Sequence, residues 1–202
     1  MEAWPLENSS IEEIYIPSSV KHVENGAFAF LNLARLEIGD GCTGLKLVGS
    51  SVLSGDGKRF LYTLCDGEYE YYKTLNKSFA YEVPFGVEEI GDEAFSYCES
   101  LESLEIPANV RDIGGWATAF CNSLKALSVA EENKNYYSVD NCIIHKSSKT
   151  LALGCNYSEI PADESVTSIG YAAFAGCDKI SEIVIPASVT EIEDSAFSHC
   201  AA

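Results

Sequence analysis

Side chains that could carry out catalysis are scarce in this sequence of 202 residues. Hydrolysis by a serine or cysteine nucleophile needs a histidine beside it in a shaped pocket, and the chain has only His22, His145 and His199. No nucleophile-elbow motif is present. The segment 55–58, Gly-Asp-Gly-Lys, lacks the spacing of a phosphate-binding loop and is typical of a hairpin turn. The sequence therefore predicts a protein that is not an enzyme and holds no cofactor.

The eight cysteines follow a regular spacing and do not form metal-ligand pairs. Cys98 and Cys121 are 23 residues apart, and so are Cys177 and Cys200. Their apolar neighbours favour small buried side chains with free thiols. Disulfides between stacked turns are the alternative, although parallel side chains rarely reach the required dihedral angle. No Cys-x-x-Cys occurs, so no zinc site is predicted.

The same spacing relates whole segments of the chain. The clearest unit, residues 101–121, reads L-x-x-L-x-I-P-x-x-V-x-x-I-G followed by a segment that ends in cysteine. Segments 84–98, 166–177 and 189–200 repeat parts of it, and 11–28 fits the same pattern. A period of this length is the signature of stacked repeats.

Each unit predicts a strand, a turn and a short helical turn. Alternating apolar residues give a short strand with one buried face, and the following proline ends it. The A-F-x-x-C pattern predicts a helical turn that points Phe and Cys inward. No unit can bury its apolar side alone, so the units must stack into about seven turns with a parallel sheet along one face. The sequence predicts one α/β repeat solenoid over residues 1–202.

Two insertions interrupt the period, near residues 47–79 and 131–156. Each contains two apolar runs around a polar turn, at Asp56-Gly57 and at 146–149. This pattern predicts two β-hairpins appended to the stack.

These units resemble the BspA-like, or treponemal-type, leucine-rich repeat family, and residues 133–177 resemble its longer repeat variant. The resemblance implies a right-handed coil with its sheet on the concave face. It also implies a secreted or cell-surface protein, often adhesive, without shared catalytic residues. The chain departs from the pattern at Thr118, where phenylalanine is usual, and at Glu193, where glycine is usual. We expect Trp116 and Phe120 to fill the space left at Thr118.

Two columns of side chains should point outward from the predicted sheet, because neighbours on one face alternate along a strand. They form the candidate binding face. The first column comprises Tyr15, Glu37, Glu82, Glu105, Ser128, Glu159 and Val184; the second comprises Glu13, Arg35, Ala80, Ser103, Ala126, Tyr157 and Glu182.

The first column contains four glutamates, three of them on turns predicted to be successive. Like charges on adjacent strands cost somewhat under about 1 kcal/mol per pair in water, so the column either recognises a basic surface or keeps the sheet soluble. A calcium site is the weaker alternative, since no Asp-rich loop accompanies it. A second candidate surface lies in the first insertion, at Tyr69, Tyr71 and Tyr72, which either contact a partner or cover the adjacent turn.

The charge balance narrows the choice of partner. With 31 acidic and 13 basic residues the net charge is −18, which argues against nucleic acid and anionic membranes. No apolar run is long enough to span a membrane. The prediction is a protein or glycan ligand, bound by a secreted or cell-surface recognition module. A structural spacer and an accessory domain of a larger enzyme are the alternatives.

The chain stops directly at the end of a repeat. Solenoids usually carry polar caps. We therefore expect either a piece of a longer protein or end-to-end contact between copies.

Overall fold

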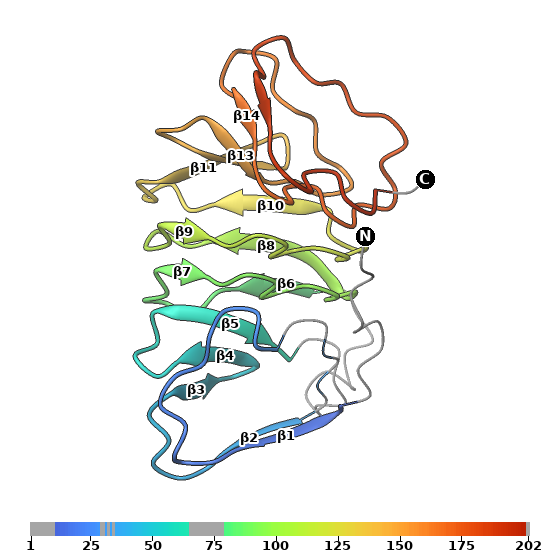
Figure 1. Ribbon diagram of the computed structural model, residues 1–202. Coiled ribbons are helices and arrows are strands. Elements are labelled where there is room, and N and C mark those ends of the chain that lie inside the picture. Colours follow the sequence, from blue (N-terminus) through green and yellow to red (C-terminus); the bar gives the residue numbers. More distant parts are fainter. Residues whose placement is uncertain (1–10, 29–30, 32, 34, 65–78, 201–202) are drawn as a thin grey trace.

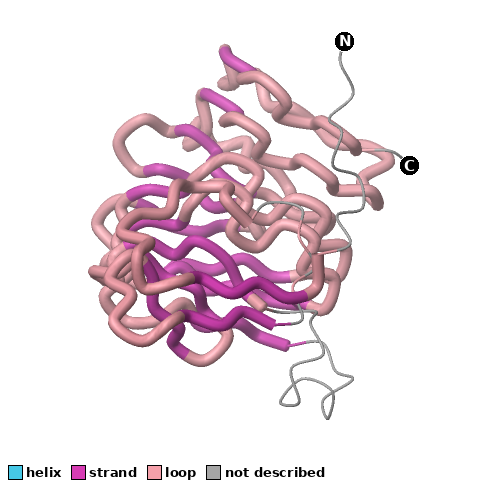
Figure 2. The backbone as a smooth tube through the Cα atoms, turned by 60° about the horizontal axis from the view of Figure 1, so that its bottom comes forward, coloured by secondary structure: helices cyan, strands magenta, loops and turns pink. Residues whose placement is uncertain are grey.

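The computed structural model describes residues 11–28, 31, 33, 35–64 and 79–200. Over these residues the chain winds as a β-solenoid of about seven turns (Figure 1). The predicted repeat solenoid is thus confirmed in its architecture. The described part consists of strands, turns and loops without a helix (Figure 2), so the predicted helical turns are wrong.

The first side of the solenoid carries the parallel strands that the repeat predicts. β6 (Phe79–Glu82), β8 (Leu101–Ile106) and β10 (Ala126–Val129) form one parallel sheet, here called the ladder sheet. β1 (Glu13–Ile16) and β2 (Arg35–Ile38) form a separate parallel pair. Alternation decides the burial, since Leu104 and Ile106 are buried whereas Glu105 between them is exposed.

The second side carries two five-stranded sheets. One contains β3 (Leu45–Val48), β4 (Ser51–Ser54), β5 (Arg59–Thr63), β7 (Glu89–Ile90) and β9 (Asp112–Ile113); the other contains β11 (Tyr136–Val139), β12 (Cys142–His145), β13 (Thr150–Leu153), β14 (Ser168–Ile169) and β15 (Glu191–Ile192). Each sheet begins with antiparallel strands and continues with parallel ones. The two predicted hairpins, β4–β5 and β12–β13, are therefore present. They are built into the second side, because the last strand of each hairpin pairs in parallel with the next turn of the solenoid.

Along residues 79–200 the third side contains four turn segments, residues 92–97, 115–120, 171–176 and 194–199. In each of them two residues four apart have positive φ, such as Trp116 (φ 57°) and Phe120 (φ 61°). This conformation interrupts an α-helix. Backbone N–H groups donate instead to the next turn, as from Phe95 to Ala117 O at 2.8 Å and from Phe174 to Ala196 O at 2.8 Å. The stacked segments therefore satisfy one another's hydrogen bonds.

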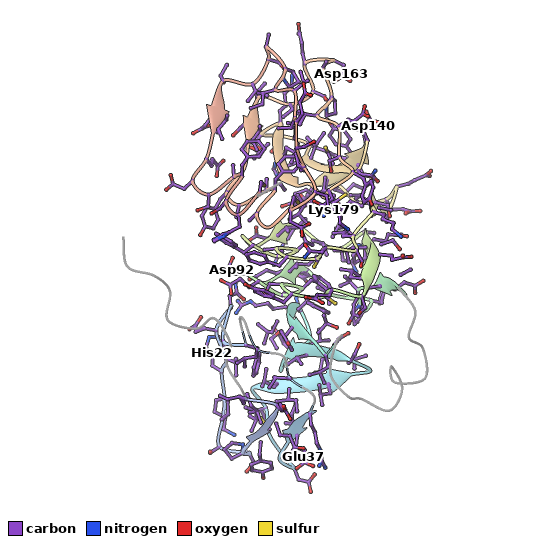
Figure 3. All side chains as sticks on the ribbon, turned by 90° about the vertical axis from the view of Figure 1, so that its right-hand side faces the viewer. His22, Glu37, Asp92, Asp140, Asp163 and Lys179 are labelled. Atoms are coloured by element: carbon purple, nitrogen blue, oxygen red, sulfur yellow. The ribbon has the colours of Figure 1, made fainter. Side chains whose placement is uncertain are left out.

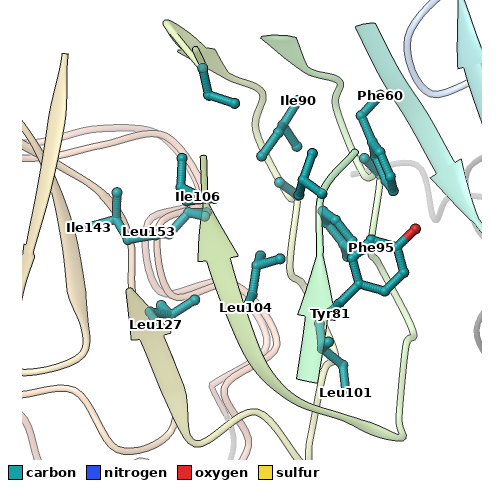
Figure 4. Close-up of a cluster of buried hydrophobic side chains, with 14 of the residues drawn as sticks. Phe60, Tyr81, Ile90, Phe95, Leu101, Leu104, Ile106, Leu127, Ile143 and Leu153 are labelled. Atoms are coloured by element: carbon teal, nitrogen blue, oxygen red, sulfur yellow. The ribbon is translucent and has the colours of Figure 1, made fainter. Parts of the chain in front are cut away.

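Phenylalanine rings form stacks in the interior. Phe60 stacks on Phe95 with ring centroids 4.6 Å apart, as Figure 4 shows within its cluster of buried side chains. Thr118, one repeat after Phe95, is buried and interrupts this column. Trp116 and Phe120 do not take its place there. They pack in a separate cluster with alanines of the turn segments, so the expectation that they fill the gap is wrong.

The recurring cysteines have a hydrogen-bonding role. The Cys121 thiol donates to Phe95 O and the Cys200 thiol to Phe174 O, each at 3.0 Å and each reaching back 26 residues to the preceding segment. Cys177 and Cys200 have free thiols, as predicted. Burial raises the pKa of the Cys177 thiol above its ordinary range. Cys98 is disulfide-bonded, which corrects the prediction of a free thiol at that position.

Candidate binding face

The ladder sheet has the register that the repeat predicts. Glu82 is aligned with Glu105, and Glu105 with Ser128; in the neighbouring column Ala80, Ser103 and Ala126 are aligned in the same way. On the β1–β2 pair, Tyr15 is aligned with Glu37 and Glu13 with Arg35. The repeat therefore gives the correct outward-facing positions for five strands.

The two predicted columns do not extend along the whole molecule. Glu37 belongs to the β1–β2 pair, which lies near one end of the stack and does not pair with the ladder sheet (Figures 1 and 3). The structure places Tyr157, Glu159 and Glu182 in turns and loops outside the strands. Hydrogen bonds to the end of the β11–β12 hairpin hold Glu159 there, since its N–H donates to Asp140 O and its carbonyl accepts from the Cys142 thiol. The structure thus brings together two glutamates on successive turns, not three.

Glu82 and Glu105 form an acidic pair at the centre of the candidate face. Both side chains are exposed, and their strands are neighbours about 4.8 Å apart. Neither carboxylate has an ion pair with any residue that the structure describes. Like charges directly opposite on adjacent strands are destabilising. A cation supplied by a partner would remove this repulsion.

Two other charged side chains of the parallel strands and their flanks, Lys125 and Arg35, are already paired. Lys125 donates to Glu102 with an Nζ–Oε1 distance of 2.6 Å, and this hydrogen bond is the main cause that raises the pKa of Lys125. On β2, Arg35 forms an ion pair with Glu37. These pairs leave the acidic pair as a local excess of negative charge on the ladder sheet.

A fully exposed phenylalanine lies in the turn that follows β6. Phe85 has 96% of its surface exposed and lies three residues after Glu82. It is held in a tight turn in which the Val87 N–H donates to Pro84 O at 3.3 Å and Gly86 has φ 91°. Positive φ at the third position of such a turn favours glycine. The turn therefore presents the ring to solvent at the end of β6.

The remaining sequence candidates lie elsewhere. Tyr69, Tyr71 and Tyr72 fall outside the described residues. His145 hydrogen-bonds with Ser148 at 2.9 Å in the β12–β13 turn, and exposed His22 pairs with Glu24 at 3.0 Å. Among the residues with described positions, no three His, Cys, Asp or Glu side chains are grouped so that they could hold a metal ion. The described part also contains no helix with the length and apolar character that crossing a membrane requires.

Comparison with protein families explains this architecture. A model described as "BspA type Leucine rich repeat region", in six copies, matches residues 2–54 and 67–202. The chain belongs to the BspA-type leucine-rich repeat family. No curated protein gives a significant match.

Several solved bacterial structures are similar to this chain. A leucine-rich cell surface protein from Faecalibacterium prausnitzii is 25% identical with a TM-score of 0.61, covering 94% of this chain and 46% of that one. A leucine-rich repeat protein from Eubacterium ventriosum is 18% identical with a TM-score of 0.52, covering 93% and 45%. The pneumococcal vaccine antigen PcpA is 16% identical with a TM-score of 0.54, covering 92% and 43%. This chain spans less than half the length of each of these proteins.

Phe85 is the residue of the candidate face that the sequence reasoning missed. In the other BspA-type turns of this chain the position after the proline carries Ser18, Ala108 or Ala187. A large apolar residue at a position that is small or polar elsewhere was the signal. The repeat pattern itself leaves this position unspecified.

Proposed function

We propose that this chain is a non-enzymatic recognition module of a secreted or cell-surface protein, and that it binds a protein or glycan partner through the ladder sheet. One observation carries the proposal: Phe85 is almost completely exposed in the turn that follows β6, and β6 and β8 carry two aligned glutamates that have no ion pair among the described residues. Neither feature stabilises the fold. Together they provide an apolar anchor and a negative field, the combination that recognises a basic surface with an apolar contact.

The family relationship supports the same role. The Faecalibacterium prausnitzii protein is named as a cell surface protein, and stacked repeats provide extended binding surfaces. A surface location follows by analogy with that relative.

The test measures binding to a panel of basic proteins, acidic proteins and neutral glycans. We expect binding to a basic member that weakens with salt. The double variant Glu82→Lys/Glu105→Lys should lower the affinity by about tenfold or more, because it reverses the charge of the acidic pair. Phe85→Ser should weaken binding without changing stability, since the ring is exposed.

The matched control is Glu131→Lys/Glu132→Lys. It makes the same charge change at two exposed residues outside the ladder sheet and should bind almost normally. Equal losses in both double variants would show that only overall charge matters. Binding that survives in all three variants would reject the ladder sheet as the binding face.

A further inference from the structure

A patch of five aromatic side chains lies on the third side, where the turn segments stack. It comprises Tyr97, Trp116, Phe120, Tyr171 and His199, here called the aromatic patch. Tyr97 stacks on Phe120 with centroids 4.5 Å apart and planes 16° apart. Trp116 lies 6.4 Å from Phe120 in a similar orientation, and His199 lies 5.4 Å from Phe120.

The second insertion brings these rings together. The turn of the solenoid that holds the insertion contributes a short connection around Gly154 to the third side, where the Gly154 N–H donates to Ala173 O. Segment 115–120 therefore contacts segment 171–176, although 55 residues separate Trp116 from Tyr171. The Trp116 indole N–H donates to the Tyr171 hydroxyl at 3.0 Å.

Two glycines provide room for the rings. A Cβ atom at Gly115 would lie 2.3 Å from the Tyr171 ring, and one at Gly176 would lie 2.4 Å from Phe120 N and 2.8 Å from its ring. Tyr171 and Phe120 therefore lie directly against backbone. The arrangement depends on these close approaches.

Much of the patch remains open to solvent. Tyr171 is 49% exposed and Tyr97 39% exposed, and His199 is exposed as well. The interior has its own rings, such as Phe95 and Phe174, which are fully buried. Burial of the core therefore does not account for the outer rings.

Carboxylates border the patch at the start of the turn segments. Asp92 accepts from the Gly115 N–H at 2.9 Å, and Glu193 accepts from the Tyr171 N–H at 3.0 Å. Glu93 occupies the position equivalent to Trp116 one repeat earlier. Its Oε2 atom is buried and accepts no hydrogen bond from the part of the chain that the structure describes. The Glu93 side chain as a whole is only partly buried, so a donor from a bound ligand would approach this carboxylate from its exposed part.

We propose that the aromatic patch is a second binding site, which takes arginine side chains from a basic peptide segment. A guanidinium group is planar, stacks on aromatic faces and carries several N–H donors. Stacking would use the Trp116, Phe120 and Tyr97 rings, while the donors would reach Glu93. The chain's charge of −18 attracts such a peptide from a distance. This site is separate from the ladder sheet, and either can exist without the other.

The experiment uses Trp116 fluorescence in a Trp4→Phe background, because these are the two tryptophans of the chain. The probe is a short peptide of alternating arginine and serine; the comparison peptides replace arginine by lysine or by glycine. We expect the arginine peptide to change Trp116 emission and to bind more tightly than the lysine peptide, with residual binding at high salt. Equal affinity for arginine and lysine, abolished by salt, would overturn the proposal in favour of simple charge attraction.

Variants locate the site. Glu93→Gln should weaken peptide binding by about tenfold, whereas Glu105→Gln, which removes one carboxylate from the ladder sheet, should not. Gly115→Ala should also weaken binding, because the added methyl displaces the exposed Tyr171 ring, which can move without unfolding the chain. Unchanged affinity in Glu93→Gln and Gly115→Ala would overturn the proposal. A neutral oligosaccharide that changes Trp116 emission when the arginine peptide does not would overturn it in favour of a glycan site.

Discussion

At the residue scale, single polar side chains join parts of the chain that the repeat pattern leaves separate. Asn133 is completely buried, and its amide makes four hydrogen bonds. Its Nδ2 donates to Pro107 O at 2.7 Å and Val110 O at 3.0 Å, while its Oδ1 accepts from two backbone N–H groups at 2.8 Å. This residue fastens the start of the second insertion to the preceding turn. A buried amide with every bond made suits only asparagine.

Asn133→Asp is expected to lower the free energy of unfolding by about 2–4 kcal/mol. The substitution keeps the shape but replaces both N–H donors by an acceptor that faces two carbonyl oxygens. Urea unfolding measures the loss. Asn135→Asp is the control, since its Nδ2 makes one longer bond of 3.3 Å to Val110 O, and it should cost about 1 kcal/mol or less. Similar losses in both would show that Asn133 is not the fastening point.

Glu93 should make stability depend on pH. Burial, followed by repulsion from Asp92, raises its pKa to about 7 from an ordinary value of 4.5. The folded state then holds a proton that the unfolded state releases, so the contribution of this group to stability falls as pH rises from about 4.5 to about 7. Below that pH window Glu93 is protonated in both the folded and the unfolded state. Above it Glu93 is ionised in both states, and the folded state bears the full free-energy cost of the partly buried charge.

Thermal melts of Glu93→Gln at about pH 5 and about pH 8 test this point. The melting temperature of the variant should fall less from about pH 5 to about pH 8 than that of the unmodified chain. Glu182→Gln, which removes an exposed carboxylate, should retain the original dependence. The same slope in all three proteins would contradict the role of Glu93.

At the scale of elements, the two insertions are integral parts of the second-side sheets. Each supplies a strand, β5 or β13, with which the next turns of the second side pair in parallel. Backbone approach is close at this point, because the Gly55 N–H at the end of β4 donates to Gly44 O at 3.0 Å. A hairpin that merely projected into solvent would not need such contact.

Gly55→Ala is expected to destabilise the fold by about 2–3 kcal/mol. Its new methyl would lie 1.7 Å from Thr43 O, so backbone must move. Gly49→Ala in the β3–β4 turn provides the comparison. That glycine has φ 60° with nothing within 4 Å of the added atom, so only the conformational cost of about 1 kcal/mol applies. If urea unfolding shows equal losses, close approach at Gly55 is not the determining factor.

At the scale of the whole molecule, the last described turn exposes residues that other turns bury. Ile192 on β15 is 50% exposed, whereas its repeat equivalents Ile169 and Ile90 are 0% and 1% exposed. Ile185 is 41% exposed, whereas Ile106 is 0% exposed. In the part of the chain with described positions, β15 is the edge strand of its sheet. An apolar edge of this kind is suited to stacking with another turn.

The 202-residue chain is therefore expected to self-associate as its concentration rises, and more strongly at high salt. Salt should help because the charge of −18 makes copies repel one another. Light scattering over a concentration series measures the association, and Ile192→Glu should reduce it. A strict monomer at every concentration and salt level would contradict end-to-end contact.

The sequence by itself determined the solenoid and the outward-facing positions on β1, β2, β6, β8 and β10. Apolar spacing of 23 residues, the two-residue alternation and the prolines that end strands are local properties, so Glu82, Glu105 and Ser128 could be aligned without coordinates. The hairpins at Asp56-Gly57 and 146–149 were equally local, since turn residues between apolar runs specify them.

Only the tertiary structure decided which separate turns meet. Glu37 does not lie beside Glu82, because the first insertion stands between their turns. Trp116 reaches Tyr171 because the turn that holds the second insertion contributes only a short connection around Gly154 to the third side. The turn segments that the sequence predicts as helical are not helical, because their backbone N–H groups donate to the adjacent turn segment of the stack. These outcomes depend on the order of stacking. Contacts between residues distant along the chain are set by the packing of whole turns, which no local pattern specifies.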